Sequence, residues 1–156
     1  MDTNQFGKLS RCQLVLMAAP TLRSGPVTAK LMPQKARMRL MHELFQKHFI
    51  TVENLIYMNM VRVCPHYEGG EWAFYSLSNG GFYMAPLAAP SWFVVYAAKE
   101  YQGSFLANPT GMLVTSMALS QLTCWRDGEY MTEMAFRLRD FIKLQPDAER
   151  LCELLD

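Results

Sequence analysis

Residues 64–86 read Cys-Pro-His-Tyr-Glu-Gly-Gly-Glu-Trp-Ala-Phe-Tyr-Ser-Leu-Ser-Asn-Gly-Gly-Phe-Tyr-Met-Ala-Pro. Within this stretch two aromatic, alternating runs, 71–77 and 81–85, flank Ser78-Asn79-Gly80. An Asn-Gly pair between such runs is typical of a tight β-hairpin. We expect positive φ at Asn79 and Gly80, because glycine has no Cβ and asparagine is the other residue least penalised there. The stretch therefore predicts a hairpin at the centre of the fold.

The two faces of this hairpin are both expected to be either covered or functional. Side chains alternate along a strand, which divides the first run into Trp72, Phe74 and Ser76 on one face and Ala73, Tyr75 and Leu77 on the other. Neither set is purely polar, so neither face is typical of one that is open to water.

The rest of the chain is mainly helical by its pattern. A helix is predicted over 34–49, where Met38, Met41, His42, Phe45 and Phe49 recur at helical spacing with His42 on the apolar side. A second is predicted from an N-cap at Thr51 to Pro65. Further elements follow: strands at 92–97 and 105–107 joined by a turn at 101–104, a break at 108–111, and helices at 112–126, 129–144 and 146–155. We therefore expect an α+β fold, in which a small antiparallel β-sheet of three to four strands, with the Asn-Gly hairpin at its centre, packs against several α-helices.

Length and composition are those of one domain. The 156 residues, 51% of them hydrophobic, are enough to bury a single core. We expect one domain over residues 1–156, with residues 1–35 as a less ordered N-terminal arm. The apolar run 112–125 is broken by polar residues and is shorter than the roughly 20 residues of a membrane span. We therefore expect no membrane association.

Net charge restricts how the protein can act. The 15 basic and 14 acidic side chains leave a net charge of +1. A protein that imitates DNA must reproduce a phosphate ladder with one charge per roughly 1.7 Å of duplex axis. This composition excludes DNA mimicry, and it disfavours strong duplex binding. The charge is nevertheless uneven, because residues 1–48 carry eight basic and two acidic side chains, or +6, while residues 112–156 carry five and eight, or −3.

No motif for catalysis, metal binding or cofactor binding stands out. The four cysteines are widely spaced, which indicates reduced thiols in a cytoplasmic protein rather than a zinc site or disulfides. We expect no cofactor, no metal and no enzymatic activity. The weaker alternative is a small hydrolase with Cys64 as nucleophile and His66 as its base.

A family resemblance rests on three stretches. They are Tyr67-x-Gly69-Gly70-x-Trp72-x-Phe74-Tyr75-x-Leu77-Ser78-Asn79-Gly80-Gly81-Phe82-Tyr83-Met84-Ala85-Pro86, the upstream His48-Phe49-x-Thr51-Val52-Glu53 and the downstream Arg137-Leu138-Arg139-Asp140-Phe141. From about His48 to its end, the chain resembles the ArdB/KlcA antirestriction family, which plasmids and other mobile elements carry. The resemblance implies protection of incoming DNA from the type I restriction-modification machinery of the host, the expected partner, whether contacted directly or indirectly.

Five residues are candidate partner contacts: Trp72, Tyr75, Asn79, Tyr83 and Asp140. The polar tips of Tyr75 and Tyr83 suit a protein interface if they reach the surface. Asp140 lies on the polar side of its predicted helix, where the competing interpretation is a solvated residue paired with Arg137. The alternative function is that of a nucleic-acid-binding accessory protein of a mobile element, which uses its basic N-terminal third.

Overall fold

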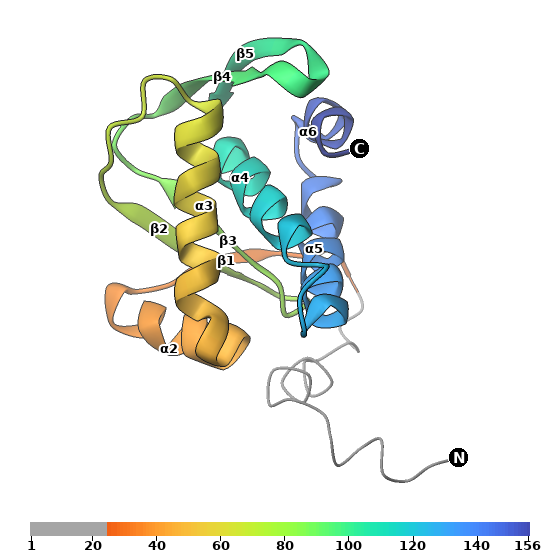
Figure 1. Cartoon of the computed structure of the whole chain (residues 1–156). Coiled ribbons are helices and arrows are strands. Elements are labelled where there is room, and N and C mark those ends of the chain that lie inside the picture. Colours follow the sequence, from red (N-terminus) through yellow and green to blue (C-terminus); the bar gives the residue numbers. More distant parts are fainter. Residues whose placement is uncertain (1–24) are drawn as a thin grey trace, which may run out of the picture.

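The computed structural model describes residues 25–156 (Figure 1). In chain order the elements are β1 (Ala29–Leu31), α2 (Gln34–Phe45), the 3-10 turn η2 (Gln46–His48), α3 (Phe49–Val63), β2 (Trp72–Leu77), β3 (Phe82–Pro86), β4 (Ser91–Tyr96), the 3-10 turn η3 (Ala97–Lys99), β5 (Tyr101–Leu106), α4 (Ala107–Gln121), α5 (Gly128–Ile142) and α6 (Ala148–Leu155). The predicted α+β class is confirmed. Of the predicted arm over residues 1–35, the part from 1 to 24 lies outside the described residues, while the remainder contains β1 and the start of α2.

The predicted hairpin is present, although its turn differs from the expected one. β2 and β3 pair antiparallel with Tyr75 opposite Tyr83. The Gly80 N–H donates to the Leu77 carbonyl at 2.9 Å, and the Leu77 N–H donates to the Gly81 carbonyl at 2.9 Å. Gly80 has φ +87°, whereas Asn79 does not have the positive φ that we expected. This pattern is that of a three-residue loop with a glycine bulge, which needs left-handed backbone only at the glycine.

Helix α4 closes the free edge of the three-stranded sheet. The strand order is β1-β2-β3, so one edge of β3 has no strand beside it. There the Met84 N–H donates to Thr115 Oγ1 of α4 at 3.2 Å. A Cβ on Gly111 would lie 1.9 Å from the Met84 carbonyl oxygen, so the helix can approach this closely only because residue 111 is glycine. The edge is thereby removed from pairing with another chain.

Both faces of the hairpin are covered, as expected, and every residue of β3 is buried. Phe82 packs edge-on against Phe45 of α2, with ring centroids 5.0 Å apart. The next residue, Tyr83, points the opposite way and stacks on Phe141 of α5 at 5.8 Å. The hairpin therefore lies between α2 on one side and α5 on the other.

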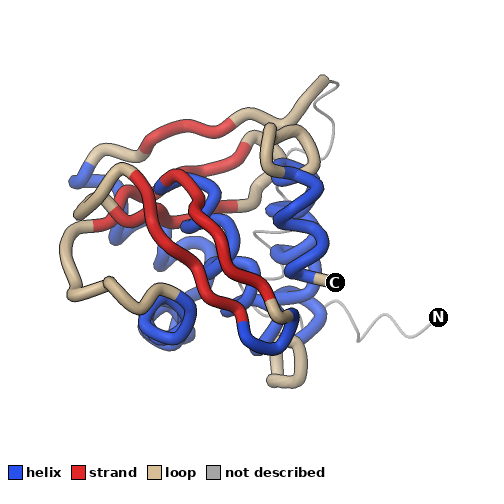
Figure 2. The backbone as a smooth tube through the Cα atoms, turned by 90° about the horizontal axis from the view of Figure 1, so that it is seen from above, coloured by secondary structure: helices blue, strands red, loops and turns tan. Residues whose placement is uncertain are grey.

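The second sheet corrects the prediction of a single sheet. β4 and β5 form a separate two-stranded sheet, with Trp92 opposite Phe105 and Val94 opposite Gly103 (Figure 2, strands in red). The turn expected at 101–104 is wrong, because those residues form most of β5. The chain reverses instead at residues 97–100, where Glu100 has φ +51°. Alternation of half-buried and exposed residues along β5 explains why its polar positions resemble a loop.

Several helix boundaries and one helix face also differ from expectation, since α2 ends at residue 45 rather than 49 and α4 ends at residue 121 rather than 126. α3 begins at Phe49 rather than after an N-cap at Thr51. Residues 108–111, expected to be a break, form the first turn and a half of α4. Pro109 fits there because the first turn of a helix needs no N–H from it. His42 is exposed rather than on the apolar side of α2.

Arg150 joins α6 to the second sheet. Its guanidinium lies over the Phe105 ring at 4.1 Å from the centroid. It donates to the Tyr101 hydroxyl at 3.0 Å and to the Ser104 carbonyl at 3.2 Å, and it is paired with Asp147 at 2.6 Å. The C-terminal helix is thus held beside β5, as Figure 1 shows.

Candidate functional site: the hairpin–α5 junction and the neighbouring pocket

The tip of the hairpin is tied to helix α5 through Asn79. Asn79 Nδ2 donates to the Arg137 backbone carbonyl at 2.9 Å, while Asn79 Oδ1 accepts from the Gly81 N–H at 3.0 Å. One side chain therefore shapes the turn and attaches it to a residue 58 positions away. We call this contact the hairpin–α5 junction.

A column of three rings supports the junction from within. The Tyr75 and Tyr83 rings stack with centroids 4.7 Å apart and planes at 8°. Tyr83 in turn stacks on Phe141, at 5.8 Å and 20°. Burial raises the pKa of the Tyr83 phenol, and the neighbouring Tyr75 adds to this effect. The phenol is therefore a neutral packing group at physiological pH.

The five candidate contacts fall into three kinds of environment. Trp72 and Tyr83 are buried, Tyr75 and Asn79 are half-buried, and Asp140 is exposed. The expectation that Tyr83 reaches the surface is therefore wrong, because β3 lies between β2 and α4 and its side chains fill the core. Trp72 lies at the other end of β2, where its Nε1 donates to the Tyr67 hydroxyl at 3.0 Å. Tyr75, Asn79 and Asp140 remain predicted contacts, and only these three are open to solvent.

The exposed carboxylate of Asp140 stands one helical turn after the carbonyl that Asn79 contacts. Both interpretations of this residue, a partner contact and a solvated residue paired with Arg137, stay predictions. The Asp140 side chain is available at the surface of α5.

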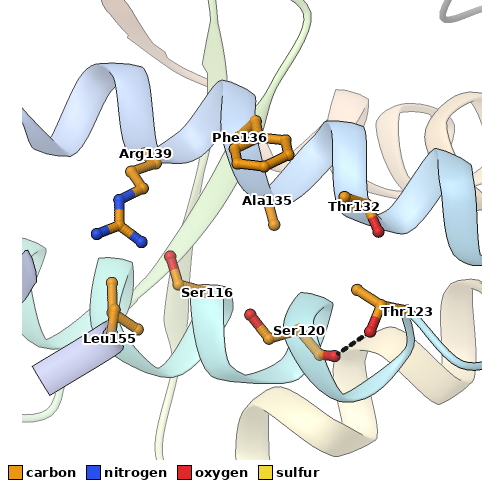
Figure 3. A pocket seen from close by; sticks show the side chains of 8 residues that line it. All are labelled: Ser116, Ser120, Thr123, Thr132, Ala135, Phe136, Arg139 and Leu155. Atoms are coloured by element: carbon orange, nitrogen blue, oxygen red, sulfur yellow. Dashed lines mark hydrogen bonds between the residues drawn. The ribbon is translucent and has the colours of Figure 1, made fainter.

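A pocket that helix α5 also lines was not predicted from the sequence. It measures about 150 Å³ and lies between α4, α5 and the end of α6 (Figure 3). Its lining consists of Ser116, Ser120, Thr123, Thr132, Ala135, Phe136, Arg139 and Leu155, and we call it the α4–α5 pocket. The only local sequence signal of the pocket is the four-residue spacing of Ser116 and Ser120, which puts both on one face of α4. This spacing does not predict a pocket unless the position of α5 is known.

A second, more open pocket contains the loop that precedes the hairpin. It measures about 520 Å³, and its walls include His66, Glu68, Trp92 and Phe93. Cys64 does not line it and is only 1% exposed. Burial raises the pKa of the Cys64 thiol to about 12, so almost no thiolate forms at neutral pH. The arrangement does not support the nucleophilic pair of Cys64 with His66.

Residues 25–156 contain neither a candidate metal centre nor a helix that could span a membrane. Across residues 25–156, no group of three or more His, Cys, Asp or Glu side chains is placed to hold a metal ion. Each helix within that range is too short or too polar to cross a lipid bilayer.

The described fold defines a class of protein. It is a small α+β protein in which an antiparallel hairpin is held between helices, its free edge is closed by a helix, and polar residues gather where the hairpin tip meets α5.

Comparisons with known proteins identify the family. The family model described as "Antirestriction protein" matches residues 65–156. The uncharacterized protein YfjX of Escherichia coli K12 is 34% identical over 110 residues, which cover 69% of this chain and 72% of YfjX. The antirestriction protein KlcA of Escherichia coli is 29% identical over 136 residues, which cover 84% of this chain and 96% of KlcA.

A solved structure agrees with these sequence matches. It superimposes with a TM-score of 0.79 at 29% identity and covers 86% of this chain and 98% of its own. That structure is described as showing that KlcA and ArdB have a novel fold and antirestriction activity against type I DNA restriction systems in vivo but not in vitro. The chain belongs to the antirestriction protein family that includes KlcA and ArdB.

Proposed function

We propose that this protein protects incoming DNA by alleviating type I restriction in the cytoplasm of the host, through contacts with protein rather than by mimicry of DNA. The observation that carries the proposal is the likeness to the solved KlcA and ArdB fold, at a TM-score of 0.79 over 86% of this chain. The activity of KlcA and ArdB against type I restriction systems is the function that the same fold supports here.

Charge supports contact with protein over mimicry of DNA. Residues 25–156 carry 12 basic and 13 acidic side chains, a difference of −1. A surface of this balance does not reproduce the charge density of a phosphate backbone. The buried Cys64 thiol likewise favours binding over chemical turnover.

The test is the plating efficiency of unmodified phage on a type I restricting strain, with and without this protein. The expected result is a large rise in plating efficiency that is confined to the restricting strain. A matched strain without the restriction genes controls for effects on phage growth. The assay is made in cells because the related activity was seen in vivo but not in vitro.

Two outcomes would contradict the proposal. Unchanged plating in the restricting strain, with the protein present and folded, would remove the antirestriction function. A rise of equal size in both strains would show an effect on phage growth instead. In either case the alternative, nucleic-acid binding by the basic N-terminal third, would become the leading hypothesis.

A further inference from the structure

We propose that the α4–α5 pocket binds a neutral aromatic hydroxyl group, supplied by a tyrosine side chain of the protein that this chain contacts. The inference rests on the proposed function for the source of the group, a protein partner. Binding of the group itself can be measured without that function.

The size of the pocket suits one aromatic ring. Its volume is about 150 Å³, and an engineered cavity of similar volume in another protein binds benzene. Ala135, Phe136 and Leu155 provide apolar surface for the faces of a ring. Phe136 is 58% exposed although it is aromatic, so the pocket has an uncovered apolar rim. A ring that enters from solvent would cover this rim as well.

One buried polar atom in the pocket indicates where the hydroxyl would lie. Ser116 is 4% exposed, and its Oγ has no hydrogen-bond partner within residues 25–156. Figure 3 shows this oxygen directed from α4 into the space below α5. Ser116 is on a helix, where a serine hydroxyl can bond the carbonyl four residues earlier, but here it does not. A buried hydroxyl without a partner costs free energy, and a ligand oxygen would satisfy it.

The charges at the same end of the pocket favour a neutral ligand. The Arg139 guanidinium borders the pocket and is already bound to the Asp156 carboxylate. That hydrogen bond raises the pKa of Arg139, so the guanidinium stays a cation, and the Asp156 carboxylate neutralises its charge. An anionic ligand would lie close to the Asp156 carboxylate and be repelled by it. The Ser116 hydroxyl and the remaining guanidinium N–H groups are donors, so the ligand needs an oxygen that accepts hydrogen bonds without carrying charge.

A tyrosine side chain combines these requirements. Its ring fills the apolar part, and its phenol oxygen accepts from the Ser116 hydroxyl, which has no other partner among the described residues. Tyrosine is also enriched among the residues that dominate the binding energy of protein interfaces. Phe136, which lines the pocket and is exposed, lies four residues before the exposed Asp140 on α5. One partner surface can therefore contact both.

The first experiment measures binding of p-cresol, which reproduces the tyrosine side chain, to the full-length protein by amide NMR titration. We expect shifts at Ser116, Ser120 and Ala135, and a dissociation constant about five- to tenfold lower for p-cresol than for toluene, since toluene lacks the hydroxyl. In Ser116→Ala the two probes should bind equally. Absence of p-cresol binding would overturn the proposal, as would an unchanged preference in Ser116→Ala. Tighter binding of p-toluate than of p-cresol would overturn the assignment of a neutral group.

The second experiment blocks the pocket in cells. Ser120 lines the pocket and is exposed, so Ser120→Phe should fill the pocket from its solvent side without disturbing the core. The matched control is Asn108→Phe, at an exposed position on the same helix outside the pocket. We expect protection to fall about tenfold or more in Ser120→Phe and to remain in Asn108→Phe. Full protection by Ser120→Phe would overturn the proposal.

Two safeguards keep the result interpretable. If Ser120→Phe does not fold by circular dichroism, Ala135→Leu narrows the pocket from α5 and takes its place. If the wild-type protein gives no protection, the proposed function fails, and the p-cresol titration alone then decides the binding of the aromatic group.

Discussion

At the scale of single residues, Asn79 makes two hydrogen bonds with its side chain. Nδ2 reaches the Arg137 carbonyl and Oδ1 reaches the Gly81 N–H. The first bond is tertiary and the second is local, so loss of the amide affects the packing of α5 and the shape of the turn together.

We predict that Asn79→Ala lowers the free energy of unfolding by about 2 kcal/mol, since two partly buried hydrogen bonds are lost at about 1 kcal/mol each. Urea unfolding followed by circular dichroism measures this change. Asn79→Asp separates the two bonds, because it retains the acceptor for Gly81 but places a carboxylate against the Arg137 carbonyl. An Asn79→Ala variant as stable as the wild type would contradict the role of the junction.

Cys64 provides a second test at this scale. We predict that Cys64→Ala leaves phage protection unchanged, because the thiol is buried and its pKa is about 12. In the native wild-type protein, a thiol reagent should modify the exposed Cys124 much faster than Cys64. Mass spectrometry of the labelled peptides gives both rates. Loss of protection in a folded Cys64→Ala variant would instead favour the hydrolase alternative.

The sequence predicted local residue roles better than tertiary ones. Gly80 has positive φ as its place in an Asn-Gly turn indicates. The partner of Asn79 lies 58 residues away, and nothing in the hairpin sequence specifies which helix will be there. Tyr83 was expected at the surface for its polar tip, but a residue on a strand enclosed on its faces and its edge is buried whatever its chemistry. The α4–α5 pocket needs three helices in place, so no single segment encodes it.

At the scale of elements, the contact between α4 and the edge of β3 depends on a missing side chain. Gly111 lets the helix backbone meet the Met84 carbonyl, and Thr115 one turn later supplies the hydroxyl for the Met84 N–H. A helix with ordinary side chains at both positions would stand farther from the strand and leave its edge open.

We predict that Gly111→Ala lowers the free energy of unfolding by about 2 kcal/mol or more, because the new Cβ forces helix and strand apart. At an exposed helical position, by contrast, replacing glycine with alanine raises the free energy of unfolding by about 1 kcal/mol. Thermal and urea unfolding measure the difference. Ser120→Ala, at an exposed position of the same helix, is the control and should be nearly neutral. A stabilised Gly111→Ala would show that α4 lies farther from β3.

The existence of most elements was predictable, whereas several of their boundaries were not. The hairpin and the helices after residue 127 follow from turn residues and periodicity. Residues 108–111 contain Asn, Pro and Gly, which usually end elements, but Pro109 falls in the first turn and Gly111 faces a strand. The polar stretch 101–104 forms a strand because it pairs with β4, and its polar side chains are tolerated because alternate residues of β5 face solvent. In each case a tertiary neighbour decided the outcome.

At the scale of the whole molecule, acidic side chains whose pKa is raised by burial predict the response to alkaline pH. Burial raises the pKa of Cys64 from 9.0 to about 12, and burial with a smaller effect of nearby Glu53 raises that of Tyr57 from 10.0 to about 12. The unfolded chain therefore releases these protons at lower pH than the folded protein. The stability that both groups contribute is complete below about pH 9 and is lost as the pH rises towards about 12.

Urea unfolding in the presence of a reductant, at about pH 8 and about pH 10.5, measures this loss. We expect a clear fall in the free energy of unfolding at the higher pH. The fall should be smaller in Cys64→Ala, which has one group fewer to titrate. Equal stability at both pH values would show that these groups are hydrated in the folded state.

Charge balance predicts the behaviour of the whole chain towards DNA. We expect the full-length protein not to shift a duplex of random sequence at about 150 mM salt, since too few phosphates can be neutralised to release counterions. An electrophoretic mobility assay over a range of salt concentrations tests this. A shift that weakens steeply with salt would support the nucleic-acid-binding alternative instead, and deletion of residues 1–35 would then be the informative variant.

The position of the reversal between β4 and β5 shows where the protein can be labelled. Residues 97–100 are all exposed, whereas residues 101–104 carry the hydroxyl and carbonyl that hold Arg150. Exposed loop tips are the places where insertions are best tolerated. An affinity epitope placed between Ala98 and Lys99 would leave α6 attached and both chain ends unaltered. The protein could then be purified from infected cells together with its bound partners, by means of an epitope that does not contact the hairpin–α5 junction.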